Sequence, residues 1–225
     1  MPAYSWLLFD ADGTLFDFDR AEARALEMVL ADLGRSASAA CLESYRRMNR
    51  SLWRAFELGR ISQDEIKVKR FELWLGEMGI AADASAVGRD YALRLSEQRD
   101  LLADAHEVVE ELARRYRLLI ITNGLSEVQR PRFERSSLRP FLQDIVVSGE
   151  VGAAKPEAGI FDAAFARMGA PARREVLMIG DSLTADVTGA IRYGIDACWC
   201  NFRGERTELP VKHTVTRLTG LLDFL

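Results

Sequence analysis

Three short segments of the chain are predominantly apolar: 4–9, 118–121 and 176–179. Apolar runs of this length are typical of strands that are buried on both faces, as in a parallel sheet. Two weaker runs, 145–148 and 197–202, predict further strands of the same sheet. Each of the three stronger runs is followed by polar or glycine-rich residues, which is where a strand would end and a turn would begin.

Helical periods lie between these predicted strands. Apolar residues recur at three- and four-residue spacing in 105–116, 156–168 and 184–193. Strands that alternate with helices over 100–225 predict an α/β fold with a doubly wound (Rossmann-like) parallel sheet. In such sheets, ligands bind beyond the carboxyl ends of the strands.

The segment 17–99 has several helical periods and no convincing strand. Within it, Ser62 and Glu65 have the Ser-x-x-Glu spacing of a capping box, which predicts that a helix begins near Ser62. An all-helical insert of about 80 residues after the first strand is far longer than an ordinary connection. The predicted domains are therefore an α/β core made of 1–16 and 100–225 and a helical cap made of 17–99.

The composition changes this picture little, because 225 residues with 48% hydrophobic and 28% charged residues are typical of a globular protein. Thirty Lys and Arg stand against 34 Asp and Glu, and the basic residues are scattered, so no nucleic-acid polymer is expected as a partner. The apolar run 6–9 is too short for a signal-peptide core, and no run approaches the ~20 apolar residues of a membrane span. We therefore expect a cytoplasmic protein without a membrane partner. We expect a monomer or a homodimer.

The cysteines and histidines exclude several kinds of site. Three cysteines are an odd number in a chain of this size, which argues against a disulfide framework. Cys198 and Cys200 alternate with Trp199, so we expect both thiols to be buried as small apolar groups. Only two histidines are present, and Lys155 is followed by Pro, so neither histidine-phosphatase chemistry nor a P-loop is expected.

Carboxylates follow two of the predicted strands. Asp10 and Asp12 stand two residues apart after the first strand, and Asp181 and Asp186 follow 176–179. Close carboxylates repel unless a divalent cation or a proton offsets their charge, and Asp10 and Asp181 at adjacent strand ends would share one Mg²⁺. The alternatives are an Asp-rich turn at Asp10 and, at the second pair, a loop acid followed by a helix N-cap.

Three further positions are suited to binding an anion. Gly13 lets the chain turn sharply and bring backbone N–H groups towards an anion. Thr122 and Asn123 follow the strand 118–121 and offer a hydroxyl and N–H groups, although both residue types are common in turns. Lys155 precedes a predicted helix, where an ammonium and a helix N-terminus would face the same anion; the alternative is a solvated surface charge.

These elements, taken in order, resemble the four signature motifs of the haloacid dehalogenase superfamily of aspartate-nucleophile phosphatases. The helical insert after the first motif resembles that superfamily's first type of cap. The motifs are Asp10-Ala11-Asp12-Gly13-Thr14, then Thr122 after an apolar strand, then Lys155-Pro156, and finally Gly180-Asp181 with Asp186.

The resemblance implies a role for each of these residues. Asp10 would be the nucleophile, and Asp12 would be the general acid and base. Mg²⁺ would be held by Asp10, by the backbone carbonyl of Asp12 and by Asp181, with Asp186 supporting the metal or orienting Lys155. The phosphoryl oxygens of a small-molecule phosphate monoester would be bound by Thr122, Asn123 and Lys155.

A narrower resemblance concerns the YjjG-type pyrimidine 5′-nucleotidases, which hydrolyse nucleoside monophosphates such as dUMP, UMP and dTMP. It rests on residues 8–12, 122–129 and 194–201, whereas Gly13 stands where some members carry an acidic residue. The alternatives are a phosphoglycolate or phosphosugar phosphatase, a phosphomutase of the same superfamily, or a binding protein that keeps the fold without turnover.

Overall fold

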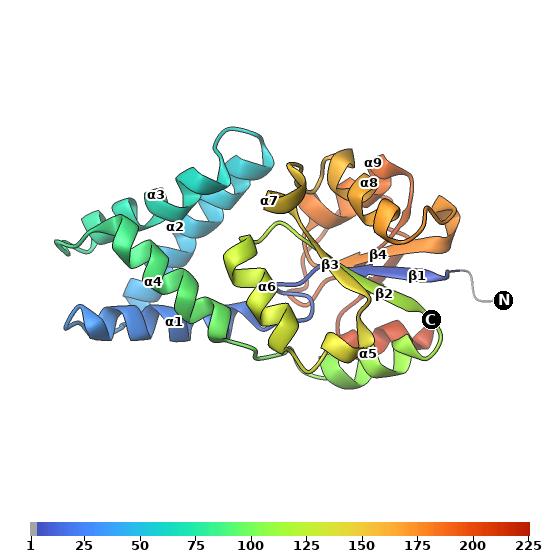
Figure 1. Cartoon of the computed structure of the whole chain (residues 1–225), viewed down its shortest axis with the longest axis horizontal. Helices are drawn as coiled ribbons and strands as arrows, with labels where there is room; N and C mark the ends of the chain where they lie inside the picture. The colour runs from blue at the N-terminus through green and yellow to red at the C-terminus, as the bar shows by residue number, and fades with distance from the viewer. Residues whose placement is uncertain (1–3) are drawn as a thin grey trace. The chain divides into compact units, whose positions relative to one another are not determined.

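The computed structural model describes residues 4–225, and the chain divides into two compact units (Figure 1). The first unit, called the core unit below, combines the described residues of Met1–Phe18 with Arg99–Leu225. The second, called the cap unit, is Asp19–Gln98. The division falls where the sequence changes from strand-like to purely helical periods and back.

The core unit is built on a six-stranded sheet with the strand order β3-β2-β1-β4-β5-β6, in which every neighbouring pair is parallel. The order runs outward in both directions from β1, which is the pattern of a doubly wound sheet, so the predicted fold class is confirmed. The five predicted strands are present, and the short edge strand β6 adds a sixth. The strands are β1 (Trp6–Phe9), β2 (Arg117–Thr122), β3 (Asp144–Val147), β4 (Val176–Gly180), β5 (Asp196–Cys200) and β6 (His213–Val215).

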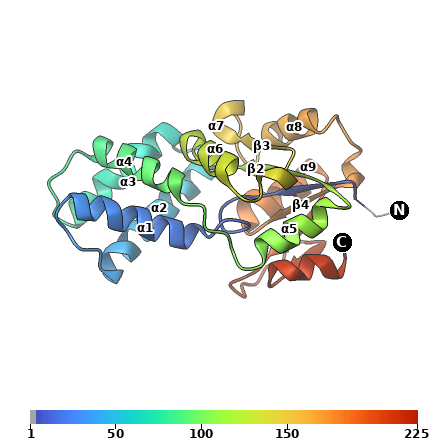
Figure 2. The ribbon, with the colours of Figure 1, turned by 60° about the horizontal axis from the view of Figure 1, so that its bottom comes forward.

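Helices cover both faces of this sheet (Figure 2). Alternate side chains of each strand face opposite ways, so Leu7 and Phe9 pack with α5 and the C-terminal η4, whereas Trp6 and Leu8 pack with α8 and α9. The first of these clusters includes Cys198 and Cys200, which are buried free thiols as predicted. The core helices are α5 (Ala105–Ala113), α6 (Ser126–Arg135), α7 (Ser148–Val151), α8 (Ala158–Arg167) and α9 (Thr188–Tyr193), with short η1 (Arg139–Phe141), η2 (Arg173–Glu175), η3 (Leu183–Val187) and η4 (Leu218–Asp223).

One predicted helix differs from the structure. The segment 184–193 is predicted as one helix, but it consists of a π-helical turn, η3, followed by α9. The hydroxyl of Thr188 donates a hydrogen bond of 2.7 Å to the carbonyl of Leu183, five residues back. Asp186 therefore lies on a π turn, a feature that is frequent at functional sites.

The cap unit contains four helices, and an aromatic cluster holds three of them together. Tyr45 of α2 packs at 5.5 Å between ring centroids against both Phe71 and Trp74 of α3 and against Tyr91 of α4. The predicted capping box is present, since Ser62 accepts from the Glu65 N–H and the Glu65 carboxylate accepts from the Ser62 N–H. The helices are α1 (Phe18–Asp32), α2 (Ala39–Glu57), α3 (Gln63–Glu77) and α4 (Ala84–Glu97).

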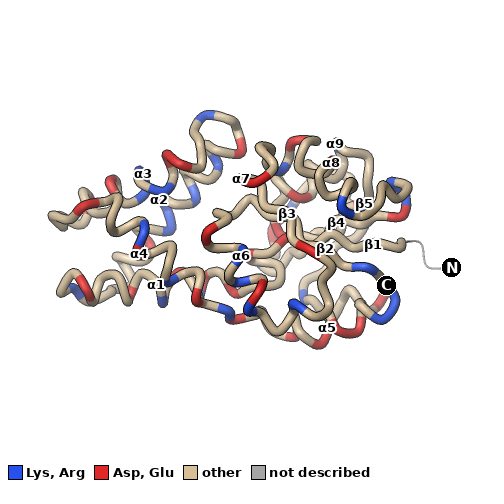
Figure 3. The backbone as a smooth tube through the Cα atoms, in the orientation of Figure 1, with Lys and Arg blue, Asp and Glu red and all other residues tan. Residues whose placement is uncertain are grey.

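Charged residues are distributed over the helices of both units, with Lys and Arg interspersed among Asp and Glu (Figure 3). Several pairs span one helical turn, such as Arg94 with Asp90 and Arg114 with Glu110. Exposed pairs of this kind contribute little to stability, so the fold depends mainly on its two apolar clusters and on the aromatic cap. Among the helices of residues 4–225, none is long and apolar enough to cross a membrane.

One carboxylate of the cap unit is buried. Glu22 is 2% exposed and accepts hydrogen bonds from Arg46 Nε at 3.1 Å and from Asn49 Nδ2 at 3.2 Å. Loss of water around the carboxylate raises the pKa of Glu22 to about 7, against the lowering effect of Arg46. The folded protein therefore holds a proton on Glu22 at pH values where the unfolded chain has lost it.

We expect the contribution of Glu22 to the free energy of unfolding to fall as the pH rises from its ordinary value of 4.5 to about 7. A Glu22→Gln variant loses this dependence, so its stability relative to the wild type rises across that window by on the order of 2 kcal/mol. Urea unfolding of both proteins between pH 4.5 and pH 8 measures the difference.

A matched control is Glu77→Gln. Hydrogen bonds from Ser44 and Arg47 lower the pKa of Glu77, so its contribution is present at high pH and is lost as the pH falls. The two variants should therefore deviate from the wild type in opposite directions with pH. Parallel stability curves for the wild type and Glu22→Gln would contradict the assignment to Glu22.

Candidate active site

Three of the predicted site residues lie at neighbouring strand ends of the core unit. Asp10 follows β1, Thr122 ends β2 and Asp181 follows β4. Because β1 lies between β2 and β4 in the sheet, the carboxyl ends of these parallel strands are adjacent. This is the edge at which doubly wound sheets bind ligands.

Lys155 is buried at this edge. Its side chain is 2% exposed, and Nζ lies 2.5 Å from Asp10 Oδ1 and 2.7 Å from Asp186 Oδ1. The ammonium also donates to the carbonyl of Ile121 at 2.8 Å. Burial lowers the pKa of Lys155, but the carboxylates of Asp10 and Asp186 outweigh it and leave the pKa above its ordinary value. Lys155 is therefore a buried cation, and its interpretation as a solvated surface charge is wrong.

Asn123 holds the backbone of Lys155. The side-chain Nδ2 donates to the Lys155 carbonyl, and the Lys155 N–H donates to Asn123 Oδ1, both at 2.8 Å. This reciprocal pair joins the turn after β2 to the segment before α8. The side chain of Asn123 thus positions Lys155, a role that the sequence does not reveal. Binding of phosphate by Asn123 stays a prediction.

Thr122 and Gly124 shape the turn after β2. Thr122 is 2% exposed, and its Oγ1 accepts a hydrogen bond of 3.1 Å from the Gly124 N–H. A Cβ at Gly124 would lie 2.3 Å from Gln129 Nε2, so a larger residue would displace Gln129. Binding of the phosphoryl group by Thr122 stays a prediction.

The carboxylates of Asp10, Asp181 and Asp186 form an acidic cluster. Each offers one oxygen, and these oxygens all lie within 4.8 Å of one another. Burial and the neighbouring carboxylates raise the pKa of Asp10 against the lowering effect of Lys155. Burial and Asp186 raise the pKa of Asp181 to about 7. Three carboxylates beside one ammonium retain excess negative charge, and oxygen-only donors suit a hard divalent cation, so the residues fit Mg²⁺.

The acidic cluster contains Asp10 and Asp181, two of the predicted metal ligands, together with Asp186. The prediction combines Asp10 and Asp181 with the backbone carbonyl of Asp12 and gives Asp186 a supporting role. The structure groups the carboxylate of Asp186 with the other two, whereas the carboxylate of Asp12 contacts α6. Asp186 is also held in place, since its Oδ2 accepts from the Ser182 N–H at 3.0 Å.

Gly13 allows the loop after β1 to approach Asp181 closely. Its φ of +83° is unfavourable for a residue with a side chain, and a Cβ there would lie 2.7 Å from Asp181 Oδ2. Two contacts that the sequence analysis did not identify fix the backbone of Asp181. Its N–H donates to Thr14 Oγ1 at 3.1 Å, and Trp199 Nε1 donates to its carbonyl at 3.0 Å. Thr14 and Trp199 therefore orient an acid of the cluster without contributing a charge.

Asp12, like Asp181, is a partly exposed acid of the site. Its side chain is 23% exposed, and it forms an ion pair with the fully buried Arg132. Gln129 donates a second hydrogen bond to the same carboxylate. Both partners lie on α6, three residues apart, and sequence reasoning missed their role. The available signal was their i, i+3 spacing on the helix that follows the Thr122 turn.

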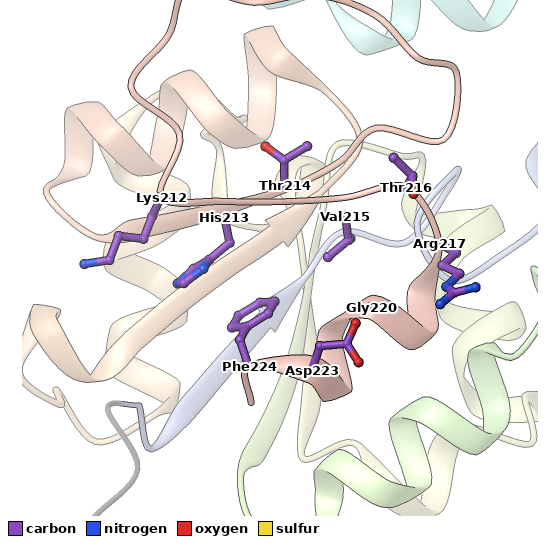
Figure 4. A pocket seen from close by; sticks show the side chains of 9 residues that line it. All are labelled: Lys212, His213, Thr214, Val215, Thr216, Arg217, Gly220, Asp223 and Phe224. Carbon is purple, nitrogen blue, oxygen red and sulfur yellow. The ribbon is translucent and has the colours of Figure 1, made fainter.

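A separate pocket of about 580 Å³ lies beside β6, at the edge of the sheet (Figure 4). The His213 ring stacks on Phe224 there, with 4.1 Å between centroids. Its two basic side chains, Lys212 and Arg217, lie at opposite ends of the pocket and do not converge on one point. The predicted site residues are not among those that line this pocket.

Comparison with known proteins identifies relatives over most of the chain. The family profile described as haloacid dehalogenase-like hydrolase matches residues 4–194. The HAD-hydrolase YfnB of Bacillus subtilis is 38% identical over 201 residues, which are 89% of this chain and 86% of YfnB. A crystal structure of YfnB, described as bound to magnesium and as revealing interdomain movement, has a TM-score of 0.91 and 35% identity, covering 98% of this chain and 97% of that one.

Two further relatives carry the name of an activity. Pyrimidine 5′-nucleotidase PynA of Streptococcus pneumoniae is 36% identical over 225 residues, which are 99% of this chain and 95% of PynA. Pyrimidine 5′-nucleotidase YjjG of Escherichia coli is 33% identical over 198 residues, which are 88% of this chain and 86% of YjjG. Both similarities extend over the cap unit as well as the core unit, because they cover nearly the whole chain.

Proposed function

The chain belongs to the haloacid dehalogenase-like hydrolase family, and on that premise we propose that it is a Mg²⁺-dependent phosphomonoesterase with Asp10 as its nucleophile. The observation that carries the proposal is the buried Lys155, which pairs with both Asp10 and Asp186 at the strand ends. A buried ammonium beside a carboxylate nucleophile supplies positive charge where a phosphoryl group would be transferred.

In the first step, an oxygen of Asp10 attacks phosphorus and forms a new P–O bond. The ester P–O bond breaks, its electron pair goes to the leaving oxygen, and the protonated carboxyl of Asp12 supplies the proton that makes an alcohol. Lys155 stabilises the charge on the phosphoryl oxygens, and Thr122 donates a hydrogen bond to them. The product of this step is an aspartyl phosphate on Asp10.

In the second step, water attacks phosphorus and Asp12, now a carboxylate, takes a proton from that water. The P–O bond to Asp10 breaks, which restores the Asp10 carboxylate and releases inorganic phosphate. Asp12 thus ends the cycle protonated, as it began, and the sum of both steps is hydrolysis of the ester. In the superfamily whose motifs the sequence resembles, an acid at the position of Asp12 distinguishes the phosphatases from the alkyl-halide dehalogenases.

Asp10, Asp181 and the backbone carbonyl of Asp12 would hold Mg²⁺, with Asp186 beside them. When bound, the ion offsets negative charge on the nucleophile and on the transferred phosphoryl group. The excess of buried carboxylates over ammonium groups at the strand ends supports this assignment, as does the magnesium named in the YfnB structure.

As substrates we propose pyrimidine nucleoside 5′-monophosphates of the dUMP, UMP and dTMP type. The support is the similarity to PynA and YjjG over nearly the whole chain, which includes the cap unit. The active-site residues are those of a general phosphomonoesterase, so they do not select among leaving groups. Selection among substrates must therefore come from segments that differ between proteins that share this fold.

We expect phosphate release from dUMP, UMP and dTMP with a kcat/KM at least about tenfold above that for purine nucleotides, sugar phosphates and phosphoglycolate. Release should fall to background with EDTA and return when Mg²⁺ is added in excess. The measurement is a phosphate-release assay over this panel at several substrate concentrations. A sugar-phosphate preference would overturn the nucleotidase assignment and keep the mechanism, whereas full activity in EDTA would contradict the metal. A phosphomutase would instead retain the phosphate on an organic product.

A further inference from the structure

The carboxylate of Asp12 is held on both of its oxygens by one face of α6. Gln129 Nε2 donates to Oδ2 and Arg132 NH1 donates to Oδ1, each at 2.5 Å. Gln129 and Arg132 are three residues apart, so their side chains project from the same side of the helix. Because α6 begins directly after the turn of Thr122, this face belongs to the same end of the sheet as the acidic cluster.

Both donors are themselves fixed by their surroundings. Gln129 is 2% exposed, and its amide lies against Gly124, where any Cβ would overlap it. Arg132 is 0% exposed, and its guanidinium carbon lies 4.6 Å from the centre of the Phe16 ring. Phe16 closes the loop that carries Asp12, since its carbonyl accepts from the Gly13 N–H at 3.0 Å. These contacts join α6 to the loop that carries Asp12 and leave the side chains of Gln129 and Arg132 little rotamer freedom.

A fully buried guanidinium is costly unless it is paired, so stability alone gives weak reason to place one here. Packing alone would be satisfied by an apolar side chain over Phe16. The pairing instead fixes a carboxylate that is partly open to solvent. A carboxylate has about four lone-pair sites, and the two donors occupy two of them, so each oxygen keeps a site for proton exchange.

We propose that Gln129 and Arg132 are positioning residues that orient the Asp12 carboxylate for proton transfer. The inference rests on the proposed function, in which Asp12 protonates the leaving oxygen and then deprotonates water. The two donors touch neither substrate nor metal in this scheme. Their effect is to restrict the Asp12 side chain to one orientation, and a displacement of about 1 Å costs on the order of 10²-fold in rate.

The test compares two leaving groups in Gln129→Met and Arg132→Lys variants. The value of kcat/KM reports the steps up to loss of the leaving group. The p-nitrophenolate ion leaves without a proton, whereas the alkoxide of dUMP needs one. We expect kcat/KM for dUMP to fall about 10- to 100-fold, with KM for dUMP near the wild-type value. The kcat/KM for p-nitrophenyl phosphate should fall less than about threefold. Phenyl phosphate, whose phenolate is more basic, provides the same comparison without a nucleotide.

Arg130→Gln is the matched control, because Arg130 lies on the same helix but pairs with the surface carboxylate of Glu150. It should leave the ratio between the two leaving groups unchanged. Equal losses on both substrates, or no loss, in Gln129→Met would overturn the inference, because a merely structural role does not distinguish leaving groups. If Arg132→Lys does not fold, as judged by circular dichroism, Gln129→Met decides alone.

Asp12→Asn separates failure of this inference from failure of the proposed function. It should lose more activity on dUMP than either positioning variant and should show the largest change in the leaving-group ratio. An unchanged ratio in Asp12→Asn would refute the general-acid assignment itself. A changed ratio in Asp12→Asn with an unchanged ratio in Gln129→Met and Arg132→Lys would refute only the positioning role.

Discussion

Replacing Asp10 by Asn is expected to abolish phosphate release, with a loss on the order of 10⁴-fold or more in kcat. An amide has almost the same shape as a carboxylate but is not a nucleophile towards phosphorus. The fold should persist, because the amide oxygen of the variant can still accept from Lys155, which also keeps its ion pair with Asp186. The measurements are phosphate release under saturating Mg²⁺ and thermal unfolding with and without Mg²⁺.

The control for this variant is Asp223→Asn, which changes an exposed acid of the core unit and should leave turnover near the wild-type value. Intact-protein mass spectrometry should exclude deamidation of the introduced asparagine, which would regenerate Asp and mimic residual activity. Turnover within about tenfold of the wild type in intact Asp10→Asn would refute the nucleophile assignment, whatever the substrate.

Most strands of the sheet were predictable from the sequence, because a buried strand is marked by its own run of apolar residues. A strand buried on both faces must be apolar at every position, so β1 and β4 are visible in the sequence without knowledge of their neighbours. The edge strand β6 was not predictable, because three residues that include His213 and Thr214 carry no apolar run. The convergence of Asp10 and Asp181 follows from topology alone, since carboxyl ends of parallel strands share one edge.

The contacts that orient the site were not predictable, because they depend on tertiary placement. The sequence identifies Asp12 but not the helix face that holds it, since that face is set by how α6 packs on the sheet. The reciprocal hydrogen bonds between the Asn123 side chain and the Lys155 backbone were likewise not predictable. The burial of Lys155 also depends on tertiary packing, so the sequence left a solvated surface charge as an alternative to the predicted anion-binding role.

Lys155→Met is expected to cost both activity and stability. Methionine fills nearly the same space but removes the ammonium, which leaves Asp10 and Asp186 buried without their partner. Breaking a buried pair by removing one partner costs about 3–5 kcal/mol, and loss of the charge that faces the phosphoryl group costs about 10²- to 10³-fold in kcat. Mg²⁺ should restore part of the stability, because a cation bound by the folded state offsets the same carboxylates. Urea unfolding with and without Mg²⁺ measures both effects.

The control Lys212→Met removes an ammonium that is 56% exposed and should change the free energy of unfolding by less than about 0.5 kcal/mol. A double-mutant cycle with Asp10→Asn then shows whether the stability effect arises from the pair. In the Asp10→Asn background, removal of Lys155 leaves only Asp186 without its partner, whereas in the wild type it leaves both Asp10 and Asp186. The loss in free energy of unfolding caused by Lys155→Met should therefore be smaller by about 1–3 kcal/mol in that background. Equal costs in the two backgrounds would mean that the pairing of Lys155 with Asp10 contributes nothing to stability, and the electrostatic account of that pair would be wrong.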